Sequence, residues 1–144
     1  MGRWGYGIFQ NDTACDFKYL VVDGGGLVPV EHALERVLSS GDRYLDGSEA
    51  DEALAAADII ARLLGSFGQQ DAYTEDIDAW VRSSPAKVTP ALVEKALQTV
   101  QRVLAEYFKI MAEDNEDTED FAEWEREINA LTERLRPFVP PSSP

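Results

Sequence analysis

Asp58 is the residue of this 144-residue chain whose surroundings most suggest a binding or chemical role, because it lies in the apolar, alanine-rich stretch 54–61. An unpaired carboxylate buried there would cost several kcal/mol, so Asp58 needs a partner or an outward path. It either points out toward Arg62, one helical turn away, or holds a specific partner inside. Three further carboxylates are candidates for the same cluster: Asp12, Asp16 and Glu106.

Hydrogen-bond donors for this cluster lie at the start of the chain, in the Trp4 indole and the Asn11 amide. One interpretation is a polar clasp that fixes the N-terminal segment to the helices, and we favour it. The other is a pocket in which converging carboxylates bind a small ligand or act in catalysis. The same six residues would line that pocket: Trp4, Asn11, Asp12, Asp16, Asp58 and Glu106.

Other patterns for catalysis and metal binding are weak. His32 is the only histidine, and between Glu31 and Glu35 it is typical of a helix surface. Cys15 is the only cysteine, and we predict a small buried side chain with no third group to support a Cys-His pair. The Glu-x-x-His motif of di-metal bundles and the glycine of a calcium loop are absent. We therefore predict no catalytic residue, no metal and no cofactor.

Charge is the strongest global signal, since 27 acids against 13 bases give a net charge of −14. Such a surface repels nucleic acid and anionic lipid, and it attracts basic proteins. Residues 113–127 hold nine acids and one base, Arg126. The simpler interpretation of this run is a solvated turn and a helix start, where negative charge is stabilising. We expect its first part to face a partner: Glu113, Asp114, Glu116, Asp117, Glu119 and Asp120.

Helical spacing of apolar residues predicts the elements that position these groups. Glycine at alternate positions in residues 1–10 predicts an extended arm, and proline predicts a flexible tail over 137–144. Cap residues, prolines and the three-to-four spacing predict a compact all-α bundle of five or six helices in a single domain, 1–144. The predicted helices span 11–22, 29–38, 48–64, 74–82, 89–111 and 121–136. One cysteine, no secretory signal and no apolar span predict a cytoplasmic protein.

The first 17 residues resemble the opening of an uncharacterised bacterial group, domain-of-unknown-function family 4259. Its members begin Met-Gly-x-Trp-Gly-x-Gly-x-Phe-x-Asn-Asp-x-Ala-x-Asp-aromatic, and residues 1–17 match every fixed position. Residues 54–61 resemble the family's alanine-rich helix, with Asp58 where Glu is more usual. The closing helix is similar at Trp124, Ile128, Leu131, Arg134 and Leu135. The family's Ser-Glu-Leu and Leu-Trp segments correspond here to Ala105-Glu106-Tyr107 and Ile110-Met111, so only Glu106 carries over.

These patterns favour a non-catalytic acidic protein-binding module over an enzyme. Its concrete form is an immunity-type inhibitor of a basic toxin or of another bacterial protein, which the resemblance implies by analogy only. The alternative is a small-ligand-binding protein or an enzyme whose pocket is formed by the N-terminal arm and the helix carboxylates. The pattern leaves the oligomeric state open.

Overall fold

The computed structural model describes residues 8–41, 45, 47–84, 87–114 and 118–139; for 107–121 no side chain is described. This part of the chain contains six α-helices and no strand, which confirms the predicted all-α bundle. In chain order the helices are α1 (Asp12–Leu20), α2 (Leu27–Leu38), α3 (Gly47–Leu63), α4 (Glu75–Ser83), α5 (Pro90–Asp114) and α6 (Thr118–Leu135).

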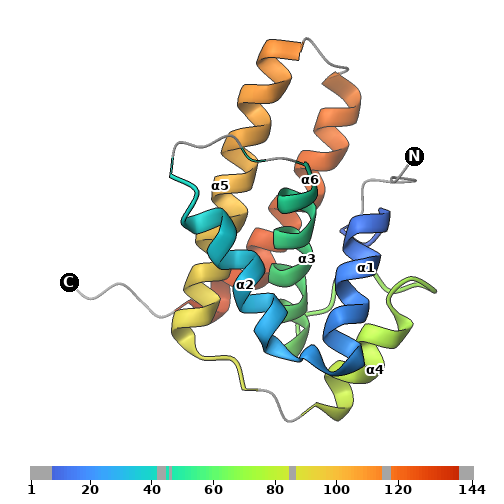
Figure 1. The fold of residues 1–144 in the computed structure, drawn as a ribbon. Coiled ribbons are helices and arrows are strands. Elements are labelled where there is room, and N and C mark those ends of the chain that lie inside the picture. Colours follow the sequence, from blue (N-terminus) through green and yellow to red (C-terminus); the bar gives the residue numbers. More distant parts are fainter. Residues whose placement is uncertain (1–7, 42–44, 46, 85–86, 115–117, 140–144) are drawn as a thin grey trace.

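Helix α3 is the centre of the bundle and contacts each of the other α-helices (Figure 1). Its residues 53–62 are all buried. Alanine suits this place because its small side chain lets neighbouring helices approach closely while it keeps a high helix propensity. Its central position accounts for the nearly all-round apolar pattern of this helix.

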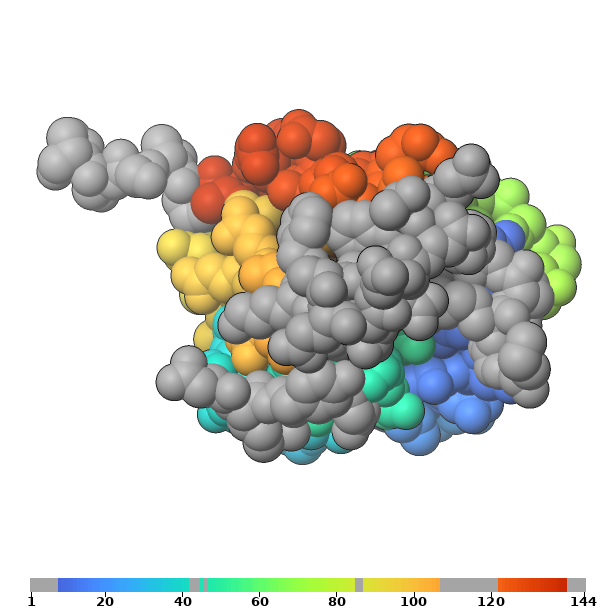
Figure 2. All heavy atoms as spheres, turned by 90° about the horizontal axis from the view of Figure 1, so that it is seen from above, coloured from blue at the N-terminus to red at the C-terminus, as the bar shows by residue number. Residues whose placement is uncertain are grey.

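The other helices are amphipathic and surround α3. Helices α5 and α6 run side by side as a long pair, while α1 and α4 cover one flank of α3 and α2 covers another (Figure 1). Turned by 90°, the molecule presents α6 along the edge opposite α1 and α2 (Figure 2). The core side chains of the outer helices include Phe17, Leu34, Ile77, Val100 and Ile128, each at most 2% exposed.

Side-chain caps begin two of the helices. The Asn11 Oδ1 accepts the Ala14 N–H at 2.8 Å and begins α1, while the Thr89 hydroxyl accepts the Leu92 N–H at 3.2 Å and begins α5. Pro29 differs from its prediction as a first helical residue, because α2 already begins at Leu27. Proline is tolerated there because the N–H groups of a first turn have no intrahelical acceptor.

A wide π-type turn, Val21–Gly25, links α1 to α2. Its geometry depends on glycine: Gly24 has φ 118° and Gly26 has φ 59°, values that other residues rarely adopt. The turn folds the chain back so that α2 packs on both α3 and α5. The glycine run thus separates α1 from α2.

The two chain ends fall only partly within the described residues. Residues 1–7 of the predicted arm lie outside them, whereas Ile8 and Phe9 form a turn and are buried in the core. At the other end, Arg136–Phe138 forms a 3-10 turn after α6, and 140–144 of the predicted tail lie outside. Among the described helices, none combines the length and the apolar character needed to cross a membrane.

Candidate functional site

Asp58 is fully buried in α3, and two arginines surround its carboxylate. Arg62, one turn later, donates from Nε to Oδ1 at 2.6 Å. Arg134 of α6 donates from Nη1 to Oδ2 at 3.0 Å and from Nη2 to Oδ1 at 3.4 Å. The two alternatives for Asp58 thus coincide, since Arg62 is its partner and the pair lies inside the bundle.

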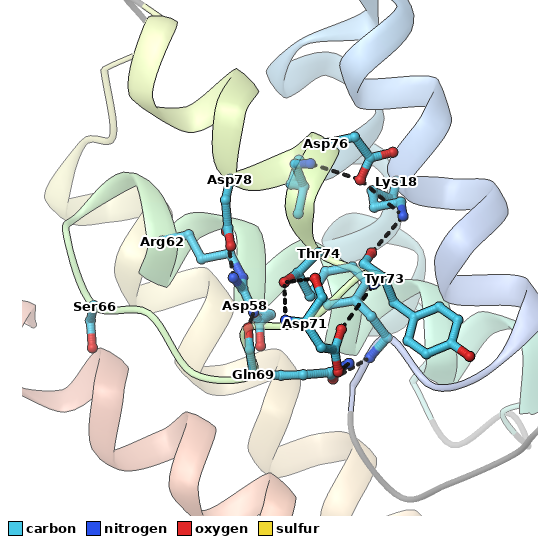
Figure 3. A network of polar contacts seen from close by, with 12 residues as sticks. Lys18, Asp58, Arg62, Ser66, Gln69, Asp71, Tyr73, Thr74, Asp76 and Asp78 are labelled. Atoms are coloured by element: carbon cyan, nitrogen blue, oxygen red, sulfur yellow. Dashed lines mark hydrogen bonds and ion pairs between the residues drawn. The ribbon is translucent and has the colours of Figure 1, made fainter.

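Arg62 extends the cluster toward α4. Its Nη1 donates to Asp78 Oδ1 at 2.5 Å and its Nη2 to the Gln69 carbonyl at 2.6 Å. The guanidinium carbon lies 5.4 Å from the ring centroid of Phe9 and 5.8 Å from that of Phe67, within the range of cation–π attraction. We call Asp58, Arg62, Asp78 and Arg134 the arginine network, of which Figure 3 shows the part around Arg62.

Lys18 of α1 is a further buried cation and lies on the other side of the loop between α3 and α4 (Figure 3). Its ammonium group donates to the Tyr73 carbonyl at 2.6 Å and pairs with Asp76 Oδ1 at 3.0 Å. It also lies 4.8 Å from the ring centroid of Tyr19. Lys18 therefore ties α1 to the beginning of α4.

The loop between α3 and α4, residues 64–74, is the common target of these three cations. Arg134 donates to the Ser66 carbonyl at 2.6 Å, while Arg62 and Lys18 donate to the carbonyls of Gln69 and Tyr73. A loop without regular structure leaves its carbonyls without helical partners, and charged donors satisfy them here. These three cations and the groups that they contact form a clasp that holds the α3–α4 loop against α1, α3 and α6, whereas the clasp predicted from the sequence concerns the N-terminal segment.

The end of the N-terminal segment joins the same clasp through Phe9. Its N–H donates to Gln69 Oε1 at 3.2 Å, and its carbonyl accepts the Cys15 thiol at 3.4 Å. Gln69 in turn donates from Nε2 to Asp71 Oδ2 at 2.9 Å. The Trp4 indole, predicted as a donor to Asp58, lies outside the described residues.

The arginine network is suited to structure more than to proton transfer. Each nitrogen of Arg62 and Arg134 donates to an oxygen, and both oxygens of Asp58 accept from arginine. Among the described residues, no buried side-chain nitrogen or oxygen is left without a hydrogen-bond partner. A general base needs a lone pair directed at a substrate, and the Asp58 lone pairs are engaged by two guanidinium groups.

The structure distributes the five described candidate site residues over separate positions. Asn11 is buried and serves as a cap, with its Nδ2 donating to the Ile8 carbonyl at 3.3 Å. Asp12 and Asp16 are exposed on α1, whereas Asp58 is enclosed. Glu106 of α5 pairs instead with Arg102 at 2.6 Å. Asp58 and Glu106 therefore contact different cations, and Trp4 is not described.

Sequence reasoning missed several members of the clasp. Asp78 and Lys18 were not singled out, and Arg134 was noted only within the family's closing helix. Asp78 lies one helical turn after Thr74, and both side chains are buried. The convergence of α3, α4 and α6 on one point is tertiary information, which helical spacing does not contain.

Cys15 and His32 occupy different surroundings. Burial is the main factor that raises the pKa of the half-buried Cys15 thiol, and the carboxylates of Asp12, Asp76 and Asp16 raise it further against the opposing effect of Lys18. The thiol is therefore less reactive than a free cysteine at neutral pH. His32 lies exposed on α2, as predicted.

Glu127 is the other carboxylate whose surroundings alter its acidity. Burial raises the pKa of this half-buried α6 side chain, and the charges of Glu123 and Asp58 raise it further, against Arg126 and Arg134. Within the described part of the chain, no three His, Cys, Asp or Glu side chains form a group that could hold a metal ion.

In the acidic run of 113–127, residues 113–114 and 118–121 are described only by their backbone. Helix α6 begins at Thr118, so Glu119 and Asp120 fall in its first turn, in agreement with the predicted helix start. Residues 115–117 and the side chains of the predicted partner-facing patch lie outside the described residues.

Fold and site together define a class: a small all-α bundle around an alanine-rich central helix, with a buried charge network that holds an irregular loop. Over residues 2–127 the chain matches the model of the family described as domain of unknown function (DUF4259). The chain belongs to this family, which confirms the resemblance seen in its opening residues. Comparisons with curated proteins and with solved structures found no match.

Proposed function

We propose that this chain is a non-catalytic, cytoplasmic bacterial binding protein whose acidic exterior engages a basic protein. Its concrete form is an immunity-type inhibitor that covers the active surface of a basic toxin. Electrostatic complementarity of this kind accelerates encounter and fixes orientation, and its effect weakens as salt is added.

The observation that carries this proposal is the way charge divides between the interior and the exterior. The arginine network uses two of the 13 bases and two of the 27 acids, and these cancel inside the bundle. The whole excess of 14 negative charges therefore belongs to the remaining residues. A field of one sign around a small molecule attracts partners of the opposite sign.

The contacts of Asp58 favour this function over the alternative pocket. A ligand-binding or catalytic carboxylate would need an oxygen that reaches the ligand, whereas Asp58 is fully buried between Arg62 and Arg134. Substitution Asp58→Ala separates the two ideas. A pocket predicts lost ligand binding with an intact fold, while a structural clasp predicts a loss of the fold itself.

The binding function is tested by affinity capture from a lysate of the native host at low ionic strength. We expect a protein of basic isoelectric point, released when salt exceeds physiological strength, since screening removes the attraction. Calorimetry on the purified pair should then give an affinity that falls with salt. For the immunity-type form, the captured protein should inhibit growth when expressed alone and be harmless when expressed with this chain.

The parent chain is compared with a charge-reduced variant, in which the six acids of residues 113–120 are replaced by their amides. It keeps the shape of the chain and removes much of the negative charge at one end of the bundle. Equal capture of neutral and basic proteins, or capture that is insensitive to salt, would contradict the proposal.

A further inference from the structure

A polar pocket lies along one face of α4, with a volume of about 510 Å³. Small-molecule sites have volumes of roughly 300–1,000 Å³, so this pocket is large enough for a ligand. Its lining comes from residues 70–72 of the α3–α4 loop and from Thr74, Glu75, Asp78 and Arg82. None of the six residues that the sequence suggested as a site lines this pocket.

Arg82 brings an unpaired positive charge to the pocket. Its guanidinium carbon lies 5.5 Å from the ring centroid of Phe67, which is also within cation–π range of Arg62. Asp78 lies one turn before Arg82, at the spacing where an ion pair on a helix forms. Asp78 pairs with Arg62 instead, and within the described residues no oxygen accepts a hydrogen bond from Arg82. The planar fork of its N–H groups is therefore available to a carboxylate.

Asp78 brings a carboxylate oxygen to the same pocket. Its side chain extends from α4 toward Arg62, which donates to Oδ1 at 2.5 Å (Figure 3). Oδ2 accepts no hydrogen bond from the part of the chain that the structure describes, although the residue is only 5% exposed. Because none of the described buried side-chain oxygens lacks a partner, Oδ2 must reach the solvent, and the side chain lines this pocket. One oxygen is thus fixed by Arg62, and the other is open to a donor from outside.

Two further carboxylates line the pocket, and neither pairs with a cation among the described residues. The oxygens of Asp71 accept from neutral donors, the Tyr73 N–H at 2.9 Å and the Gln69 amide at 2.9 Å. Glu75 is exposed, and its carboxylate has no partner in the described ranges. The negative charge at this end of the pocket is therefore not compensated by a neighbouring base.

The charges of the pocket separate into two ends. Glu75 is the first residue of α4, and Arg82 lies about 10.5 Å further along the helix axis at about 1.5 Å per residue, with Asp78 between them. A purely anionic ligand would be repelled by Glu75 and Asp71, and a purely cationic one by Arg82. A ligand with a carboxylate at one end and an ammonium group at the other satisfies both ends.

We propose that this pocket binds a short zwitterionic molecule of the size of a dipeptide. Its carboxylate accepts from the guanidinium of Arg82, and its ammonium group donates to Asp78 Oδ2 and to Glu75. A dipeptide holds its two charges about 3.5 Å further apart than a single amino acid does, which suits groups on successive turns of one helix. This inference goes beyond the proposed function, because it needs no basic protein partner.

The test is a titration with alanylalanine, followed through amide shifts in nitrogen–proton spectra. At about pH 6.5 this peptide carries both charges, and a ligand of its size should bind with a Kd of about 1–10 mM. The shifts should centre on residues 71–82. N-acetyl-alanylalanine lacks the ammonium group, and alanylalanine amide lacks the carboxylate. Each should bind about tenfold more weakly, because each loses one charge-assisted contact.

Two substitutions assign the ends of the ligand. Arg82→Gln should weaken alanylalanine binding by about tenfold and leave the amide unaffected, because the amide has no carboxylate. Glu75→Gln should weaken alanylalanine binding by about threefold, since Asp78 still accepts the ammonium group, and should leave the N-acetyl form unaffected. Arg136→Gln and Glu31→Gln are matched controls that remove one charge of each sign at exposed positions outside the pocket. They should leave all three affinities unchanged.

The outcomes decide the zwitterion site whether or not every variant folds, which urea unfolding checks. Equal affinities of the three peptides for the parent chain would overturn it, as would shifts centred away from α4. No saturation by alanylalanine at about 50 mM, well above the expected Kd, would also overturn it. An amide that binds as tightly as alanylalanine would show that Arg82 takes no carboxylate, and the site would then be rejected.

Discussion

Asp58 is the residue whose substitution should have the largest effect, because its carboxylate pairs with two arginines in the bundle. Substitution Asp58→Asn keeps the size of the side chain and removes its charge. The buried Arg62 would then keep only Asp78 as a counter-charge and the partly buried Arg134 would lose its carboxylate partner, and breaking a buried pair costs about 3–5 kcal/mol. We expect the free energy of unfolding, measured with urea, to fall by about this amount.

The matched control for Asp58 is Glu133, which pairs with Arg136 at 3.4 Å on the surface of the same bundle. Glu133→Gln should change the free energy of unfolding by less than about 1 kcal/mol, because exposed ion pairs contribute little. If both substitutions had equally small effects, the buried network could not be what holds the α3–α4 loop.

Glu127 gives a prediction for the pH dependence of stability. Its pKa in the folded protein is raised above the ordinary value of 4.5, mainly by burial. The folded state therefore holds this proton more tightly than the unfolded chain does, which favours folding below pH 4.5, and this advantage is lost as pH rises through the folded pKa. Glu127→Gln mimics the protonated form, so it should stabilise the protein at pH 7.

The measurement for Glu127 is urea unfolding of both proteins at pH 7 and at about pH 3.5, below the unfolded pKa. The stability difference between variant and parent should be present at pH 7 and close to zero at the lower pH, where the parent carboxyl is also protonated. A difference of the same size at both values would attribute the effect to packing and not to charge.

The sequence was informative about Asp58 and much less so about its partners. A lone acid in an alanine-rich stretch implies a strong requirement for a counter-charge, and Arg62 one turn away is predictable from helical geometry. Arg134 lies 76 positions further along the chain, and no local pattern pairs it with Asp58. Asp12 and Asp16 share a face of α1 as their spacing implies, but that face is exposed.

Helices were predictable where caps and apolar spacing agreed. Thr89 and Asn11 cap the starts of α5 and α1, because a side-chain oxygen of each accepts a free N–H of the first turn. This interaction is local, so the sequence can reveal it. The start of α2 was placed two residues late, because the turn before it depends on backbone angles at Gly24 and Gly26. The irregular loop of 64–74 is held by distant cations, so its path was not predictable from its own sequence.

The turn between α1 and α2 can be tested at Gly25. A Cβ atom added there would lie 2.5 Å from the Leu20 carbonyl oxygen and 2.9 Å from Pro29 Cγ. Neither a backbone oxygen nor a proline ring can move aside easily, so Gly25→Ala should lower the free energy of unfolding by about 1–3 kcal/mol. The control is Gly47→Ala, where an added Cβ meets no atom within 4 Å.

Gly47 is the first residue of α3, where alanine favours helix over glycine by up to about 1 kcal/mol. Gly47→Ala should therefore be neutral or slightly stabilising in urea unfolding. A matching small effect at Gly25 would mean that the turn relaxes, and the packing of α2 would then not depend on the close approach of Gly25 to Leu20 and Pro29.

The whole molecule separates its charges by depth. Internal pairs such as Asp58 with Arg134 are shielded from solvent ions, whereas the excess of acids remains with the other residues. Like charges at close range destabilise a compact state, and the same charges favour a basic partner. A bound basic partner and added salt should therefore both stabilise this chain, because each reduces the repulsion between its acids.

Added salt should raise the melting temperature, because a net charge of −14 repels itself most strongly at low ionic strength. Between about 0.01 M and 0.15 M salt the Debye length falls from about 30 Å to 8 Å, so most of the rise should occur there.

Neutralising the exposed acids with Glu31→Gln and Glu75→Gln should reduce this rise in melting temperature. Asp58→Asn should lower the melting temperature at every salt concentration without changing the rise, because its charge is buried. A melting temperature that falls as salt is added would show instead that surface ion pairs such as Arg36 with Glu52 outweigh the repulsion.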